Sequence, residues 1–300
     1  RTVALAGRAR RLLQQTRIGL LGERPTGYES CEYDREALAR IFGLDVVQFD
    51  LEEFFQDVRQ ADEQAVDSAL EGLSSRLDNL SQLDQAALRG TLGSYVIMKQ
   101  LATQEQLDGL AVRCWPEFFT ELGCAACGAM SMLSDELTTC SCEADVNGTI
   151  TQLILQWLSN EAAFGTDVVS IDVDQDVVVL WHCGVAPLSM ADPEAPIKGT
   201  VHSNRKLPLT MEFPLKPGRV TVARLSEADG DYRLVVGGGE MLRAPLSFSG
   251  TSGVLRFDRP ANEVLDIILG EGLEHHVSLT YGDYVPALET LSGILDIPIL

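Results

Sequence analysis

The sequence contains no long hydrophobic run, and it does not begin with methionine. No apolar stretch approaches about 18 residues, the length that predicts a membrane-spanning helix. Residues 1–17 are basic and amphipathic, but they lack the continuous apolar segment of a secretory signal. We therefore expect a cytoplasmic protein without a membrane segment. The missing methionine suggests that an upstream domain precedes this chain.

Positive charge is also scarce. Lysine and arginine together number 23 against 44 aspartates and glutamates, which gives a net charge of −21, and only four of the cations are lysines. A protein that binds nucleic acid needs a cationic surface to neutralise phosphates. The balance of charge therefore argues against a nucleic-acid partner.

The seven cysteines do not form a disulfide framework, because their number is odd and the chain is long. Cys124 and Cys127 form a C-x-x-C pair, and Cys140 and Cys142 form a C-x-C pair. The first pair lies in a stretch of small residues typical of a helix, and C-x-C is a poor zinc-binding turn. We expect reduced, metal-free thiols that behave as small buried hydrophobes.

The pattern of predicted strands and helices changes near residue 160. The first part alternates predicted strands with segments of helical spacing, which indicates βαβ units and a parallel sheet. The second part is rich in short strands separated by turns, with two late helices, which indicates a mainly antiparallel, barrel-like β domain. We therefore predict an α/β domain over 1–160 and a β domain over 161–300. The expected strands of the first part are 18–22, 44–50 and 109–116, and its expected helices are 33–43, about 51–78 and about 82–105.

The segment CSCEADVNGT, residues 140–149, holds two thiols and two carboxylates ahead of an apolar helix. Glu143 and Asp145 begin a sequence similar to a calcium-binding EF-hand loop. The twelfth position of that loop should be a bidentate glutamate but is Ile154, so the match fails. Asp145 or Asn147 is the natural N-cap of the following helix.

A metal site built from separate segments is a further interpretation. Glu143 precedes a helix. Asp167 lies 24 residues after Glu143, beyond the helix. A helix of that length can return the chain so that both carboxylates face one cleft. Two carboxylates and a histidine suit Mn²⁺ or Mg²⁺. The alternative is that both carboxylates are solvated surface charges. The histidine would come from His182, His202, His275 or His276.

These segments resemble the L-fucose isomerase and L-arabinose isomerase superfamily. CEADVNGTITQLILQWLSNEAAFGTDVV is similar to its metal-binding region, and HHVSLTYGDYVPALETLSGILDIPI is similar to its terminal segment. The resemblance implies a metal-dependent aldose–ketose isomerase acting on a sugar through an enediol. It further implies a homo-oligomer, trimer or hexamer, and an upstream α/β domain absent from this chain.

The resemblance also implies roles for individual residues. Glu143 and Asp167 would bind the metal and transfer protons, with His276 completing the metal site. The metal would be Mn²⁺, or else Mg²⁺ or Co²⁺. Candidate substrate-binding residues are Glu117, His182 and Tyr281.

Two other functions stay open from the sequence. The chain could be a sugar-binding module without catalysis, or a diverged family member acting on sugar acids. Inward-facing metal carboxylates favour an enzyme, because a passive sugar site does not require them. The metal interpretation requires the two carboxylates to lie less than about 10 Å apart, since hard cations sit about 2.0–2.6 Å from each ligand.

Overall fold

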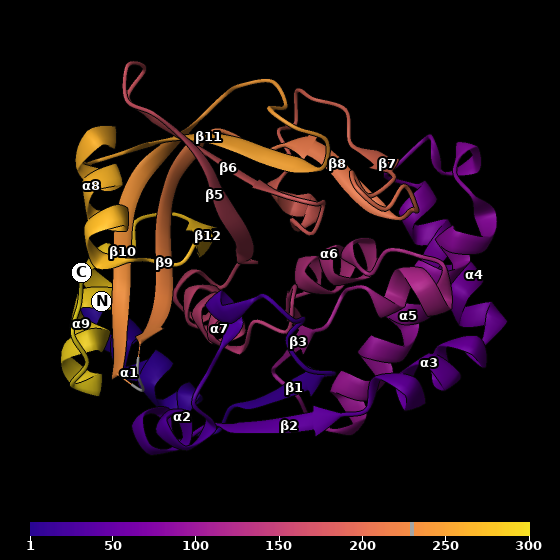
Figure 1. The fold of residues 1–300 in the computed structure, drawn as a ribbon, viewed down its shortest axis with the longest axis horizontal. Helices are drawn as coiled ribbons and strands as arrows, with labels where there is room; N and C mark the ends of the chain where they lie inside the picture. The colour runs from indigo at the N-terminus through magenta and orange to yellow at the C-terminus, as the bar shows by residue number, and fades with distance from the viewer. Residues whose placement is uncertain (229–230) are drawn as a thin grey trace.

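The computed structural model describes residues 1–228 and 231–300. It contains two sheets, a parallel one built by the first half of the chain and a larger, mostly antiparallel one built by the second half (Figure 1). The predicted combination of an open α/β part and a mainly antiparallel β part is confirmed at this level.

The parallel sheet has four strands in the order β2-β1-β3-β4. Three of them lie where the sequence predicts strands; β1 has the expected length, whereas β2 and β3 are shorter than expected. The fourth was not predicted, because it is only three residues long and lies within the cysteine-rich motif. The strands are β1 (Arg17–Leu21), β2 (Asp45–Phe49), β3 (Gly109–Val112) and β4 (Thr139–Ser141).

Five helices connect and flank these strands. The Asp50 side chain accepts hydrogen bonds from two backbone N–H groups of α3, and the Asp62 side chain accepts one from the Gln64 N–H of α4. Because each cap begins a helix, the single helix expected over 51–78 is two helices. The helices are α2 (Arg35–Phe42), α3 (Leu51–Arg59), α4 (Glu63–Ser74), α5 (Gln85–Gln104) and α6 (Cys127–Asp135). Shorter turns are the π-helical Phe118–Leu122 and the 3₁₀ segments Glu29–Cys31, Leu80–Gln82 and Leu188–Met190.

The larger sheet has eight strands in the order β10-β9-β12-β5-β6-β11-β8-β7, and an additional pairing joins β10 to β11. Every neighbouring pair is antiparallel except β11–β8. β9 and β10 are longer than the short strands expected. The strands are β5 (Phe164–Asp172), β6 (Val177–His182), β7 (Lys198–Thr200), β8 (Thr210–Pro214), β9 (Gly218–Ala228), β10 (Asp231–Leu242), β11 (Thr251–Phe257) and β12 (His276–Tyr281).

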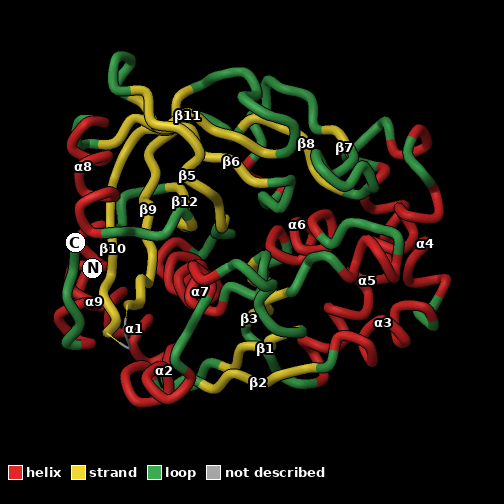
Figure 2. Tube along the Cα trace, in the orientation of Figure 1, coloured by secondary structure: helices red, strands yellow, loops and turns green. Residues whose placement is uncertain are grey.

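Helix α7 (Val146–Ser159) lies between the two sheets (Figure 2). It packs against β12 and β9 of the large sheet and against β3 and β4 of the parallel sheet. Eleven of its 14 residues are buried, which explains why its sequence is apolar on most faces. Its N-terminus therefore brings the end of β4 to the large sheet.

The two ends of the chain meet at one side of the molecule (Figure 1). Helix α1 (Thr2–Leu13) packs against α9 (Val285–Leu295), and α8 (Ala261–Glu271) lies above them. Both late helices are at the predicted positions. Within the described residues, no helix is both long and apolar enough to cross a membrane.

Candidate metal centre between the two sheets

A tight turn after β4 places Glu143. Glu143 and Ala144 have φ values of +58° and +56°, a region that residues other than glycine rarely adopt. The Ala144 N–H donates to Val112 O at 2.9 Å, which fastens this turn to the end of β3. Glu143 thus lies at the carboxyl edge of the parallel sheet, the edge where such sheets gather ligands.

Asp167 and His276 come from neighbouring strands of the large sheet. They are directly opposite each other in the β5–β12 register, so their side chains share one face. His276 Nε2 lies 3.5 Å from Asp167 Oδ1 and 2.9 Å from Glu143 Oε2. The two carboxylate oxygens are therefore no farther apart than the sum of these distances, well inside the ~10 Å limit that the metal interpretation requires.

Two of these three atoms lack a hydrogen bond. Asp167 Oδ1 and His276 Nε2 are buried and have no hydrogen-bond partner among the described residues, although they lie close to one another. Leaving a buried polar atom without a partner costs about 1–3 kcal/mol. A divalent cation placed among the three side chains would satisfy these atoms, so the residues present fit a metal ion.

Asp145 sets the orientation of the histidine. Its Oδ2 lies 2.9 Å from His276 Nδ1, and its Oδ1 accepts from the Gly148 N–H at 2.8 Å. A proton on Nδ1 leaves the lone pair of Nε2 free to bind a metal, as in many metal sites where a carboxylate holds the ligating histidine. Asp145 is the predicted N-cap of α7, but it also supports the site, which the sequence analysis missed.

The electrostatics of the site favour positive charge. Burial by itself would lower the pKa of His276, but its close contacts with Asp145, Cys31 and Glu143 raise it well above its ordinary value. Burial raises the pKa of Asp167, and His182 and His276 only partly oppose this. The centre therefore stabilises a cation, whether an imidazolium or a metal ion.

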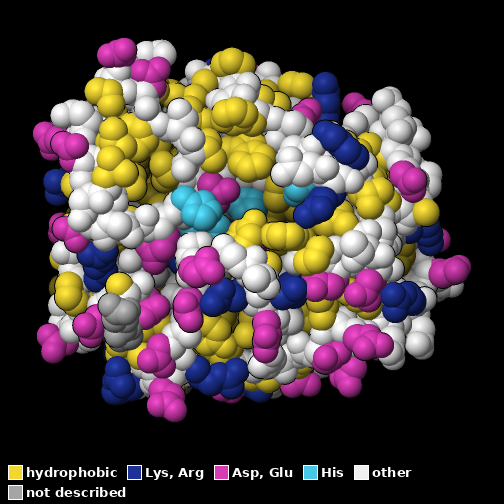
Figure 3. Space-filling model, viewed as in Figure 1, with side chains coloured by type: hydrophobic (Ala, Val, Ile, Leu, Met, Phe, Trp, Pro, Cys, Tyr) yellow, Lys and Arg dark blue, Asp and Glu magenta, His cyan; other side chains and the backbone are white. Residues whose placement is uncertain are grey.

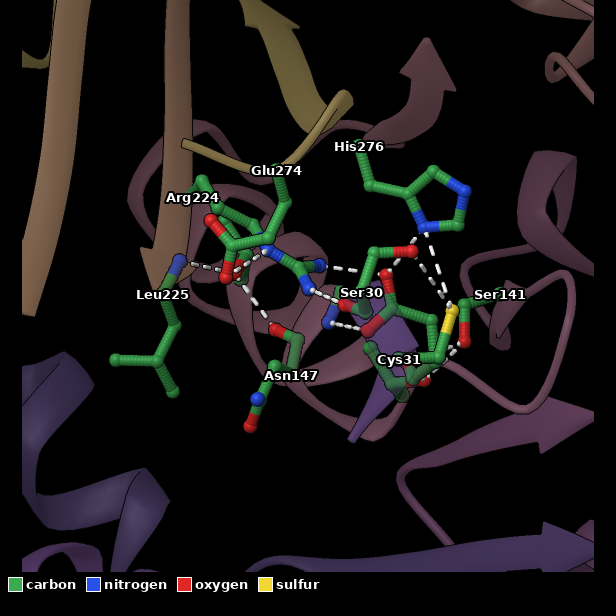
Figure 4. Close-up of polar contacts among 12 residues, drawn as sticks. Ser30, Cys31, Ser141, Asn147, Arg224, Leu225, Glu274 and His276 are labelled. Carbon is green, nitrogen blue, oxygen red and sulfur yellow. Dashed lines mark hydrogen bonds and ion pairs between the residues drawn. The ribbon is translucent and has the colours of Figure 1, made fainter. Parts of the chain in front are cut away.

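Arg224 is the second residue that the sequence analysis missed. Its side chain is buried, and its Nη1 lies 2.5 Å from Asp145 Oδ2. Nη2 donates to Ser30 O at 2.9 Å, and Nε lies 3.9 Å from Glu274 Oε1. In Figure 4, Arg224 and His276 approach the same centre, with Ser30 and Cys31 between them. The signal in the sequence was a lone arginine inside the strand VTVARLS.

This arrangement fixes the charge of Asp145. Burial alone would raise its pKa, but Arg224 and His276 outweigh burial and hold the pKa well below its usual range. Gly148 is required beside it, because a Cβ at that position would lie 2.5 Å from Asp145 Oδ2. A buried carboxylate is thus held ionised between an arginine and the histidine.

A cavity of about 20 Å³ lies beside these groups, bordered by Asp145, Asp167, His182 and His276 among others. This volume is enough for about one water molecule or ion. His182 Nδ1 accepts the Cys183 N–H at 2.8 Å, so its proton is on Nε2. Figure 3 shows histidine side chains in a hollow at the middle of one face, bordered by acidic and basic side chains.

His275 lies closer to the site than the strand alternation predicts. It precedes β12 instead of belonging to it, and one ring nitrogen lies within 4.8 Å of ligand atoms of Asp167 and His276. Alternation along HHVSLT predicts that His275 faces away from His276, and this prediction is wrong because His275 precedes the strand, whereas alternation applies only within it. His276, Ser278 and Thr280 are all buried, as expected for one face.

The structure does not bring Glu117 or Tyr281 into this cluster. Glu117 forms an ion pair with Arg113 at 2.7 Å and borders a separate surface cavity. The Tyr281 hydroxyl donates to Lys216 O at 2.5 Å. Neither residue borders the small cavity. Among the three candidate substrate-binding residues, only His182 lies there.

The chain is similar in sequence to known isomerases. Residues 180–300 match the family model of the L-fucose isomerase C-terminal domain. The chain is 33% identical over 284 residues to the sulfoquinovose isomerase of Alkalicoccus urumqiensis, covering 94% of this chain and 64% of that protein. It is 33% identical over 291 residues to the sulfoquinovose isomerase of Priestia megaterium (strain ATCC 12872 / QMB1551), covering 97% of this chain and 65% of that protein. The sulfoquinovose isomerase of Clostridium sp. (strain MSTE9) is 30% identical over 295 residues, which are 97% of this chain and 65% of that protein. The chain thus spans slightly less than two thirds of the length of these relatives.

Proposed function

The chain belongs to the fucose isomerase-like family, and from this membership we propose that it is part of a metal-dependent aldose–ketose isomerase. The observation that supports the proposal most is the approach of Glu143 Oε2 and Asp167 Oδ1 to one nitrogen of His276. A sugar-binding module without catalysis would have no need for a buried cluster of this kind.

The proposed ligands are Glu143, Asp167 and His276, with Mn²⁺ as the ion and Mg²⁺ or Co²⁺ as alternatives. This set of two carboxylates and one imidazole suits such cations. The bound ion would act as a Lewis acid that polarises the carbonyl and the adjacent hydroxyl of an open-chain sugar. Asp145 would keep His276 in the tautomer that leaves Nε2 available.

The proton transfers are assigned to the two carboxylates. In the aldose, one carboxylate would take the proton from the carbon next to the carbonyl, which leaves an enediolate and a protonated carboxylic acid. That acid would then give a proton, its own or one exchanged with solvent, to the neighbouring carbon, and the hydroxyl proton would move between the two oxygens, so atoms and charge balance. Burial raises the pKa of Asp167, which brings this carboxylate closer to the range in which it can exchange protons. His182, with its proton on Nε2, is the proposed hydrogen-bond donor to a substrate oxygen.

The substrate class follows from the relatives, which are named sulfoquinovose isomerases. We propose a sugar carrying an anionic sulfonate group, which also agrees with the possibility of sugar acids considered above. Basic side chains lie beside the hollow that contains the histidines, where they can pair with an anion (Figure 3).

The remaining expectations belong to the same proposal. They are the division of the chain at residue 160, a homo-oligomer of three or six subunits, a cytoplasmic location and an additional upstream α/β domain. A barrel-like closure of the large sheet is supported by the pairing of β10 with β11, since these strands stand at the two ends of a run of six.

The experiment uses the full-length protein and the variants Glu143→Gln, Asp167→Asn and His276→Ala. We expect each variant to reduce Mn²⁺ binding, and the carboxylate variants to slow solvent-proton exchange into the sugar by about 10²–10⁴-fold. Sulfoquinovose, fucose, arabinose and a sugar acid form the substrate panel. Mn²⁺ binding without any isomerisation would support the binding module instead, and unchanged Mn²⁺ binding in all three variants would refute the site.

A further inference from the structure

The turn between β7 and β8 carries an arginine whose charge is not neutralised by the chain. The guanidinium carbon of Arg205 lies 5.2 Å from the centre of the Trp115 indole ring. The arginine is exposed, and its side chain has no ion pair and donates no hydrogen bond among the described residues. A guanidinium held over an aromatic face keeps its N–H edge available for an anion. Arg205 is therefore in a position to bind an anionic ligand.

Two neighbouring cations are already engaged. Arg113 forms an ion pair with Glu117 at 2.7 Å. Lys206 Nζ donates a hydrogen bond to the carbonyl of Ser203. An anion that enters beside the indole would therefore meet Arg205 as the cation that does not have to give up an existing partner.

The turn that presents Arg205 is held by its own hydrogen bonds. The His202 N–H donates to Leu207 O, and the Lys206 N–H donates to His202 O, both at 2.9 Å. His202 Nδ1 accepts the N–H groups of Asn204 and Arg205 at 3.2 and 3.3 Å. Because the backbone of the turn is already ordered, less conformational entropy is lost when the arginine binds a ligand.

This turn lies beside the proposed metal centre. One ring nitrogen of His202 lies within 4.8 Å of Cys183 Sγ, which in turn lies 3.2 Å from His182 Nδ1. His182 borders the small cavity together with Asp167 and His276. Basic side chains are visible beside the histidines in Figure 3.

The indole reaches the same place from the parallel sheet. Trp115 follows Cys114, whose Sγ lies within 4.8 Å of a carboxylate oxygen of Glu143. The ring of Tyr28 packs edge-on against the indole, with 5.5 Å between the ring centres. Burial, and next the charge of Glu143, raises the pKa of Tyr28 to about 12, so the phenol is close enough to sense that carboxylate. The indole and its arginine thus lie next to the proposed metal ligands.

We propose that Arg205 binds the sulfonate group of the sugar and that Trp115 is the positioning residue for its guanidinium. This inference rests on the proposed isomerase function, in which the metal holds the carbonyl end of the sugar. The sulfonate is at the other end, on the sixth carbon, so it requires a separate partner. Its oxygens can accept two parallel N–H bonds from a guanidinium, a geometry that lysine does not offer.

The proposal has a kinetic signature. The sulfonate does not take part in the proton transfer, so its contact with Arg205 is the same in the bound substrate and in the transition state. Loss of such a uniform contact raises KM and leaves kcat less affected. Loss of a metal ligand, by contrast, lowers kcat.

The test compares sulfoquinovose with glucose, which has a hydroxyl in place of the sulfonate, in the full-length protein with Mn²⁺. Arg205→Gln should lower the ratio of kcat/KM for sulfoquinovose to that for glucose by about 10–100-fold, mainly through KM. The control is Arg259→Gln, which removes an exposed charge beyond the end of β11 that lies away from His182. It should change the ratio by no more than about twofold, because salt screens a distant charge.

Variants of the indole test its positioning role. Trp115→Leu should lower the same ratio by about 2–5-fold, the effect of losing an exposed cation–π contact. Trp115→Phe keeps an aromatic face and should lower it less. An equal effect of the two variants on both sugars would refute a positioning role for this residue.

Calorimetric titration with the two sugars separates the subsite from the reaction. Isomerisation with the same preference in Arg205→Gln as in the unmutated protein would overturn the subsite but leave the isomerase function intact. Tighter binding of sulfoquinovose than of glucose that disappears in Arg205→Gln, without isomerisation by the unmutated protein, would support the subsite and refute the isomerase function. An unmutated protein that binds sulfoquinovose no more tightly than glucose would overturn the subsite directly.

Discussion

Replacing Asp145 by asparagine separates its two roles. Asparagine caps a helix about as well as aspartate, so the cap of α7 is kept. The charge is lost, and Arg224 then stays buried with only Glu274 at 3.9 Å. Removing one partner of a buried ion pair costs about 3–5 kcal/mol. We therefore expect the free energy of unfolding to fall by about that amount, far more than the ~0.5–2 kcal/mol expected for the loss of a cap alone.

The assay is urea and thermal unfolding of the metal-free protein, which keeps metal binding out of the measured stability. At about 2–4 °C per kcal/mol, the melting temperature should fall by about 6–20 °C. Asp84→Asn is the control, because Asp84 caps α5 through the Ala87 N–H and has no ion pair among the described residues. It should change stability by no more than about 0.5 kcal/mol.

A double variant tests whether the loss of stability comes from the unpaired charge of Arg224. Combining Asp145→Asn with Arg224→Met removes both charges, so no uncompensated cation remains, and the pair should be less destabilised than the sum of the single variants. Mn²⁺ affinity should fall about 10–100-fold in Asp145→Asn, because His276 loses the carboxylate that orients it. A stability loss below about 1 kcal/mol together with unchanged Mn²⁺ affinity would refute this account.

The remaining predictions concern other parts of the site and its surroundings. Gly148→Ala should lower the free energy of unfolding by about 1–3 kcal/mol in chemical denaturation, because the added Cβ would clash with the N-cap carboxylate. Gly72→Ala in α4 is the control: nothing lies within 4 Å of the added Cβ, so this variant should be more stable by about 0.5–1 kcal/mol. A stabilising Gly148→Ala would contradict the close approach. Chelation of the divalent ion should lower the melting temperature of the unmutated protein but not that of His276→Ala, and calorimetric scans with and without chelator measure this difference. Glu117→Gln should leave Mn²⁺ affinity unchanged, because this carboxylate pairs with Arg113 outside the site. A tenfold loss of Mn²⁺ affinity in a titration would show instead that Glu117 belongs to the site.

Much of the fold could be read from the sequence because it depends on local patterns. The alternation of strands and helices before residue 160, the antiparallel strands after it and the two late helices follow from periodicity and turn residues. Strand β4 escaped prediction because three residues carry too little pattern. The division of 51–78 into two helices depended on Asp62, a start signal that was present in the sequence but was not used.

For the site, the sequence by itself determined which ligand types are available and which segments resemble a known family. The spacing from Glu143 to Asp167 suggested a carboxylate–histidine centre with one of four histidines, and only the family resemblance singled out His276. The roles of Asp145 and Arg224 were decided only by the tertiary structure, because the two residues are 79 positions apart and meet only when β9 packs beside α7. The cysteines make the same point: sequence spacing pairs Cys124 with Cys127, whereas the folded chain places Cys127 against Cys183, 56 residues away. Coordination depends on distances in space, and the crossing of elements from both sheets sets those distances.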